Sequence, residues 1–169
     1  MKTTIQSIVI FLIIGIFVFR CHKEEENSIF SGKLVSNSAC KNGLKKANMT
    51  ISIPDTLSCI DYSFDDLSNK LVIKHINTGF NCCPDSLFCK ISLRNDTISV
   101  QEFEAANLCK CNCLYDLDIE IFGVSTKKYQ IRFIEPYSVG QERIAFEVDL
   151  GKNKNGSYCV TRKHYPWGL

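Results

Sequence analysis

The residues of this chain that could perform the widest range of chemistry are its cysteines. The 169-residue sequence contains ten of them, and six fall into two short clusters. They are Cys82, Cys83 and Cys89 in the first cluster and Cys109, Cys111 and Cys113 in the second. At this density, thiols either oxidise to disulfides that stabilise an exported domain or hold a soft metal such as zinc or copper as thiolates.

Disulfides between the two clusters are the favoured interpretation. The segment 114–122 predicts a strand, and extending its alternation backwards puts all three cysteines of the second cluster on its core face. Bridges to the first cluster would staple two strand ends and restrict the unfolded chain. Outside the clusters, Cys40 and Cys159 could pair and tie an N-terminal tether to the C-terminal segment.

The cysteine count keeps two alternatives open. Nine cysteines follow Cys21, and an odd number leaves at least one thiol free, intermolecular or bound to something else. Zinc modules usually space their ligands as Cys-x-x-Cys, whereas these clusters contain Cys-Cys and Cys-x-Cys. We therefore expect no cofactor. The alternatives are zinc or copper held by both clusters, and thiol-dependent redox chemistry.

The N-terminal residues predict export. Lys2 is followed by an apolar run over 8–19, interrupted only by Gly15. This run is shorter than the roughly 20 apolar residues of a membrane-spanning helix, and it has the length of a signal-peptide core. Arg20 ends the run, and Cys21 follows directly.

A cysteine at this position resembles the acceptor cysteine of bacterial lipoproteins. The tract HKEEE over 22–26 is similar to the export tag of uncharacterised Bacteroidetes-type surface lipoproteins, and the resemblance covers only residues 1–27. It implies cleavage before Cys21, acylation of its thiol with palmitate-type chains, and a lipid anchor in the outer membrane of the cell envelope, with the membrane face left open. Phe19 and Arg20 stand where that family prefers small residues, so an uncleaved anchor and ordinary secretion are the alternatives.

Charge and length limit the kind of partner. Residues 21–169 are enough for one domain. Without Lys2 and Arg20, the chain carries 18 basic and 18 acidic side chains. Nucleic-acid binding calls for a clear basic excess, so this balance argues against it. The expected partners are the membrane, through the lipid anchor, and a protein or carbohydrate ligand that the sequence does not identify.

The chain divides into three expected parts. They are a signal peptide over 1–20, a lipidated flexible tether over 21–48 and a single β-sandwich domain over 49–169. Period-two alternation predicts strands over 49–53, 59–64, 70–76, 89–93, 97–103, 114–122, 128–134 and 144–150. Only 101–108 contains good helix formers, enough for one or two turns. The predicted fold is an all-β, cysteine-rich antiparallel sandwich of immunoglobulin-like or jelly-roll-like type.

An acidic stripe occupies one face of the strand predicted over 114–122. It consists of Asp116, Asp118 and Glu120. A calcium site would need oxygens from a loop or several strands, and a glycosidase would need two acids across a cleft. If 128–134 pairs with this strand in a hairpin, Lys128 and Arg132 fall on the same face. Ion pairing on a solvated surface then explains the stripe.

No motif of a known catalytic class stands out. The sequence lacks Gly-x-Ser-x-Gly, His-Glu-x-x-His and a phosphate-binding glycine loop. His75 lies on the apolar face of the strand predicted over 70–76. Near the C-terminus, Tyr165 and Trp167 could contact a carbohydrate or peptide, or could pack against the sandwich and close its open end. The sequence therefore predicts a membrane-anchored envelope lipoprotein that acts as a non-catalytic binding or structural module.

Overall fold

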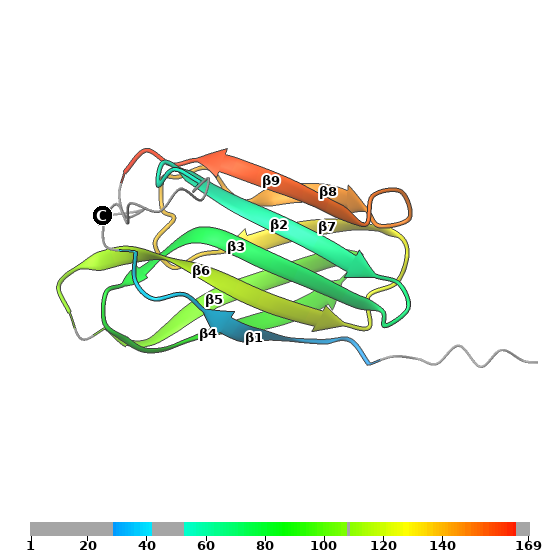
Figure 1. The fold of residues 1–169 in the computed structure, drawn as a ribbon, viewed down its shortest axis with the longest axis horizontal. Helices are drawn as coiled ribbons and strands as arrows, with labels where there is room; N and C mark the ends of the chain where they lie inside the picture. The colour runs from blue at the N-terminus through cyan, green and yellow to red at the C-terminus, as the bar shows by residue number, and fades with distance from the viewer. Residues whose placement is uncertain (1–28, 42–52, 108, 165–169) are drawn as a thin grey trace, which may run out of the picture.

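Two packed β-sheets make up the structure, a computed structural model that describes residues 29–41, 53–107 and 109–164 (Figure 1). In spatial order, the first sheet contains β1 (Ser31–Asn37), β6 (Asn112–Phe122), β3 (Lys70–Asn81), β2 (Leu57–Asp65) and β9 (Asn155–Thr161). The second sheet contains β4 (Pro84–Arg94), β5 (Thr97–Asn107), β7 (Lys128–Ile134) and β8 (Ala145–Asp149).

The core lies between the sheets and follows from alternation along the strands. In β7 every second residue is buried, because successive side chains of a strand point to opposite faces. Tyr129 and Ile131 of β7 share one hydrophobic cluster with Ile119 and Ile121 of β6. The predicted all-β, cysteine-rich sandwich is confirmed. The described residues contain no helix, and therefore none that is long and apolar enough to cross a membrane.

Strand pairing departs from the prediction in several places. β5 and β7 run parallel, so the second sheet is mixed, whereas an immunoglobulin-like or jelly-roll sandwich was expected to be antiparallel. β6 and β7 do not form the predicted hairpin, because the chain crosses from one sheet to the other between them. The helical turns predicted over 101–108 are wrong, since β5 continues along β4 to Asn107. Pairing with a neighbouring strand outweighs the helix propensity of this segment.

The flexible tether predicted over 21–48 is wrong for its central part. Residues 31–37 form β1, which runs antiparallel to β6. A Cβ added at Gly32 would lie 2.6 Å from Cδ1 of Ile91, so β1 also lies directly against β4 of the other sheet. Glycine permits this approach because it has no side chain. The rest of the expected tether, apart from residues 29–30 and 38–41, lies outside the described residues, as does 49–52 of the strand expected over 49–53.

We expect Gly32→Ala to lower the free energy of unfolding by about 1–3 kcal/mol, because the new methyl group would overlap Ile91. Urea denaturation measures the change. Lys33→Ala is the matched control, since Lys33 is exposed on the same strand, and it should change stability by less than about 0.5 kcal/mol. Equally small effects of both substitutions would contradict the placement of β1 and would support a flexible tether.

Candidate functional site

A β-bulge in β3 brings two polar side chains to the same inner face. The register of β3 against β6 shifts between His75 and Thr78, and both residues are fully buried. Within the bulge, Asn77 has a φ of 62°, a left-handed conformation that asparagine tolerates better than most residues. Its backbone N–H donates to Oδ1 of Asp116 at 3.0 Å. The bulge thus re-aims the end of β3, as bulges beside functional sites often do.

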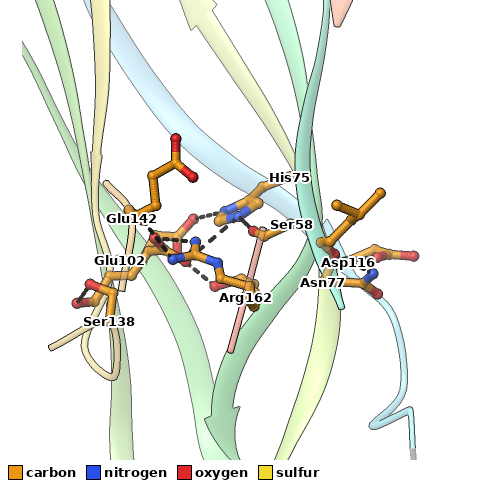
Figure 2. A network of polar contacts seen from close by, with 11 residues as sticks. Ser58, His75, Asn77, Glu102, Asp116, Ser138, Glu142 and Arg162 are labelled. Carbon is orange, nitrogen blue, oxygen red and sulfur yellow. Dashed lines mark hydrogen bonds and ion pairs between the residues drawn. The ribbon is translucent and has the colours of Figure 1, made fainter. Parts of the chain in front are cut away.

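His75 lies at the centre of a buried chain of hydrogen bonds (Figure 2). Its Nδ1 is 2.6 Å from Oε1 of Glu102, and its Nε2 is 2.9 Å from Oγ of Ser58. The second carboxylate oxygen of Glu102 accepts a hydrogen bond from Oγ1 of Thr78 at 2.8 Å. The two residues that flank the bulge therefore satisfy both oxygens of one buried glutamate.

A buried glutamate–arginine pair adjoins this chain. Nη2 of Arg162 donates to both carboxylate oxygens of Glu135 at 2.7 Å. Nη1 of Arg162 donates to the backbone carbonyl of Glu142 at 2.9 Å. Oε1 of Glu135 is 3.8 Å from Nε2 of His75, so the pair and the histidine chain form one cluster. We call these residues, with Ser58, Thr78 and Glu102, the buried polar cluster.

Two acidic and two basic side chains lie together in this buried cluster. Burial lowers the pKa of His75, but the charge and hydrogen bond of Glu102, together with Glu135, outweigh it, so the pKa of His75 is raised overall. Burial raises the pKa of Glu135, against the opposing charges of His75 and Arg162. Because both oxygens of Glu135 accept from the guanidinium, the carboxylate form fits the contact. With all four groups ionised, the cluster has no net charge, and each buried charge has a partner.

The order serine–histidine–glutamate is also that of a hydrolytic triad. A nucleophile must meet its substrate, whereas Ser58 is 0% exposed. A general base must be neutral, whereas the raised pKa of His75 favours the imidazolium, which would donate from Nε2 to Ser58. The cluster is therefore arranged to join the two sheets rather than to remove a proton from Ser58.

The same side chains also resemble a metal site. One ligand atom each from His75, Glu102 and Glu135 lies within 4.8 Å of the others. However, Arg162 already contacts both oxygens of Glu135, and Glu102 already contacts Nδ1 of His75. A cation would have to displace these contacts and sit beside a fixed guanidinium. The residues present satisfy one another better than they would satisfy a metal ion.

Four disulfides use eight of the cysteines that follow Cys21. They are Cys40–Cys113, Cys59–Cys159, Cys82–Cys111 and Cys83–Cys109, with Cα–Cα distances of 5.8, 4.1, 5.5 and 5.6 Å. Two of them join the first cysteine cluster to the second, and thereby join the β3–β4 connection to the β5–β6 connection.

The predicted pairing of Cys40 with Cys159 is wrong. Cys159 lies directly opposite Cys59 in the register of β9 and β2, so these two bond to each other. Cys40 is held beside β6 by the bridge between Lys41 and Leu114, which leaves Cys113 as its partner.

Cys89 is the free cysteine of the described residues and is half-buried. Burial, with the nearby charge of Glu102, raises the pKa of its thiol well above the usual range. Thiolates are the form that binds metals and attacks disulfides, so this thiol is poorly suited to either role. The Sγ atoms of Cys40, Cys82 and Cys113 lie within 4.8 Å of one another, as the ligands of a metal would. All three are oxidised in disulfides, and an oxidised sulfur is not a thiolate ligand for zinc or copper.

The acidic stripe of β6 is paired, but not with the expected Lys128 and Arg132. The ion pairs are Lys41–Asp116, Lys74–Asp118 and Lys70–Glu120. Lys128 and Arg132 cannot take this role because β7 lies in the second sheet. Three further predicted site residues, Cys21, Tyr165 and Trp167, lie outside the described residues.

The buried polar cluster was missed from the sequence although alternation contains it. Glu102, Glu135 and Arg162 each occupy the next inward position after buried apolar residues of β5, β7 and β9. A charged residue at an inward position, once within a strand and twice directly after one, is the available signal. Comparison of the chain with protein-family models, curated proteins and solved structures finds no match.

We expect Arg162→Met to lower the free energy of unfolding by about 3–5 kcal/mol, because it leaves the buried charge of Glu135 without its partner. Adding Glu135→Leu should recover most of the loss, since it removes the orphaned charge. The surface pair Lys128–Glu147 is the control, and Lys128→Met should cost at most about 1 kcal/mol. If Arg162→Met costs no more than the control, the buried ion pair does not form in solution.

Proposed function

We propose that this protein is a cell-envelope lipoprotein, anchored in the outer membrane through acylated Cys21, whose sandwich is a non-catalytic binding or structural module. The observation that carries the proposal is the disulfide set, because eight cysteines are paired. Such disulfides persist in oxidising compartments and are rare in the cytosol. The apolar run over 8–19, followed by Arg20 and Cys21, has the length of a signal-peptide core and supports the proposed export.

The buried polar cluster supports a non-catalytic role. Ser58 and His75 are 0% exposed, and the acids around them are occupied by internal partners. Active sites instead keep at least one reactive group open to substrate. In a binding module, such a cluster fixes how one sheet packs on the other, while ligands bind to the outer surfaces of the sheets.

Metal binding and redox chemistry have less support. Both would need thiolates, and Cys89 is the thiol that remains among the described residues. Redox-active cysteines are exposed and have a lowered pKa, whereas burial raises the pKa of Cys89. These properties fit a structural cysteine inside a rigid module.

We expect the membrane fraction of a bacterial host to contain a chain that begins at Cys21 and carries acyl groups on it, as measured by intact mass and by mass spectrometry of the N-terminal peptide. Cys21→Ser should abolish acylation and processing, whereas Cys89→Ser should leave both unchanged. A membrane-bound chain that still begins at Met1 would indicate an uncleaved anchor. A soluble chain without acyl groups would indicate ordinary secretion, and either result would overturn the proposal.

A further inference from the structure

The outer face of β4, β5 and β7 carries cations without acidic partners. Lys90 and Arg94 project from β4, and Arg132 projects from β7. All three are exposed, and none forms an ion pair with a carboxylate among the described residues. We call the surface formed by these cations and the side chains between them the basic face.

The register explains why the basic face keeps its charge. Lys90 lies opposite Gln101 and Arg94 lies opposite Thr97, while Arg132 lies opposite Ser99. The outward positions of β4 and β5 contain no acid, whereas the outer face of β6 and β3 neutralises its charges in ion pairs. The outward acid of β8, Glu147, lies opposite Gln130 and pairs with Lys128, so it leaves the three cations unpaired.

A hydrogen bond fixes the side chain of Arg132 in a position from which its guanidinium can bind an anion. Its Nε donates to Oγ of Ser99 at 2.7 Å, which lays the side chain across β5. The two Nη groups can then meet a carboxylate as a bidentate pair. Lys90 and Arg94 are four residues apart on β4, or about 13 Å, so the three cations can contact successive charges of an extended ligand.

An aromatic pair adjoins the cations. Phe88 and Phe103 stack with ring centroids 5.1 Å apart, and Nζ of Lys90 lies 5.1 Å from the centre of the Phe103 ring. Both Phe88 and Lys90 thus contact the Phe103 ring, while Phe88 remains 40% exposed. An exposed ring beside cations offers an apolar surface to a ligand that also carries negative charge.

We propose that the basic face binds an acidic polysaccharide, a chain of sugars that carry carboxylates. This inference rests on the proposed function, because it names the ligand class of that binding module. Hydroxyl and amide side chains lie between and beside the cations, namely Ser92, Thr97, Gln101 and Gln130. They suit a polyhydroxylated chain, whereas the centre of a protein interface would be richer in large aromatic side chains. A single open ring is also less than single-stranded nucleic acid requires for base stacking.

The test is titration calorimetry of the full chain, purified in detergent, with polygalacturonate oligosaccharides. The methyl-esterified oligosaccharide keeps the sugars and removes the charge, so it should not bind measurably. The triple variant K90A/R94A/R132A should weaken binding at least tenfold, and Phe88→Ala should weaken it several-fold. The matched control is K33A/K74A/K154A, which removes the same number of exposed cations from the first sheet and its turns and should bind like the wild type.

Equal weakening in both triple variants would overturn the proposal, as would no binding by the wild type. Binding of poly-L-glutamate as tight as that of polygalacturonate would also overturn it and would point to an acidic protein partner. Circular dichroism confirms that each variant is folded. Acylation of Cys21 is measured separately, so a chain that binds polygalacturonate without being acylated would contradict only the membrane anchor.

Discussion

Four ionisable side chains are buried between the two sheets, and their mutual neutralisation is the constraint on which the rest of this structure depends. Glu102, Glu135, His75 and Arg162 come from β5, from the residue after β7, from β3 and from the residue after β9. An unpaired charge in such a place would cost several kcal/mol, so these chain segments must meet in one arrangement. The bulge at Asn77 follows from this constraint, because it places His75 and Thr78 together on Glu102.

The disulfides extend that rigidity from the core into the connections. Asn81, at the end of β3, donates to the carbonyl of Cys109 at 2.6 Å and accepts from the N–H of Cys83 at 3.0 Å. The disulfide between these two cysteines fixes the same two connections covalently. A module held in this way presents the outer surfaces of its sheets as fixed platforms. The outer faces of β3 and β6 neutralise their charges in ion pairs, whereas β4 and β7 of the second sheet leave cations available to a partner.

Alternation predicted the fold class because most strands have one buried and one solvated face, as β7 shows. It could not assign strands to sheets, since β6 and β7 are neighbours in sequence and lie in different layers. β1 was missed because it is polar and largely exposed. The disulfides between the clusters were foreseeable, whereas the partner of Cys40 depends on where β1 lies. The buried polar cluster was not predicted because Glu102 lies in the segment 101–108, for which helical turns were expected, and Glu135 lies one residue beyond the strand expected over 128–134. Alternation nevertheless places both side chains on inward positions.

The most direct test of the central claim is nitrogen-15 NMR of the His75 ring in the folded protein, between about pH 6 and pH 9, around the ordinary histidine pKa of about 6.5. His22→Gln and His164→Gln variants assign its signals. The account predicts an imidazolium that is protonated on both nitrogens at neutral pH and titrates above that ordinary value, because Glu102 and Glu135 outweigh its burial. A neutral ring at neutral pH, with Nε2 unprotonated and facing Ser58, would contradict the account and would restore the protonation state of a catalytic triad.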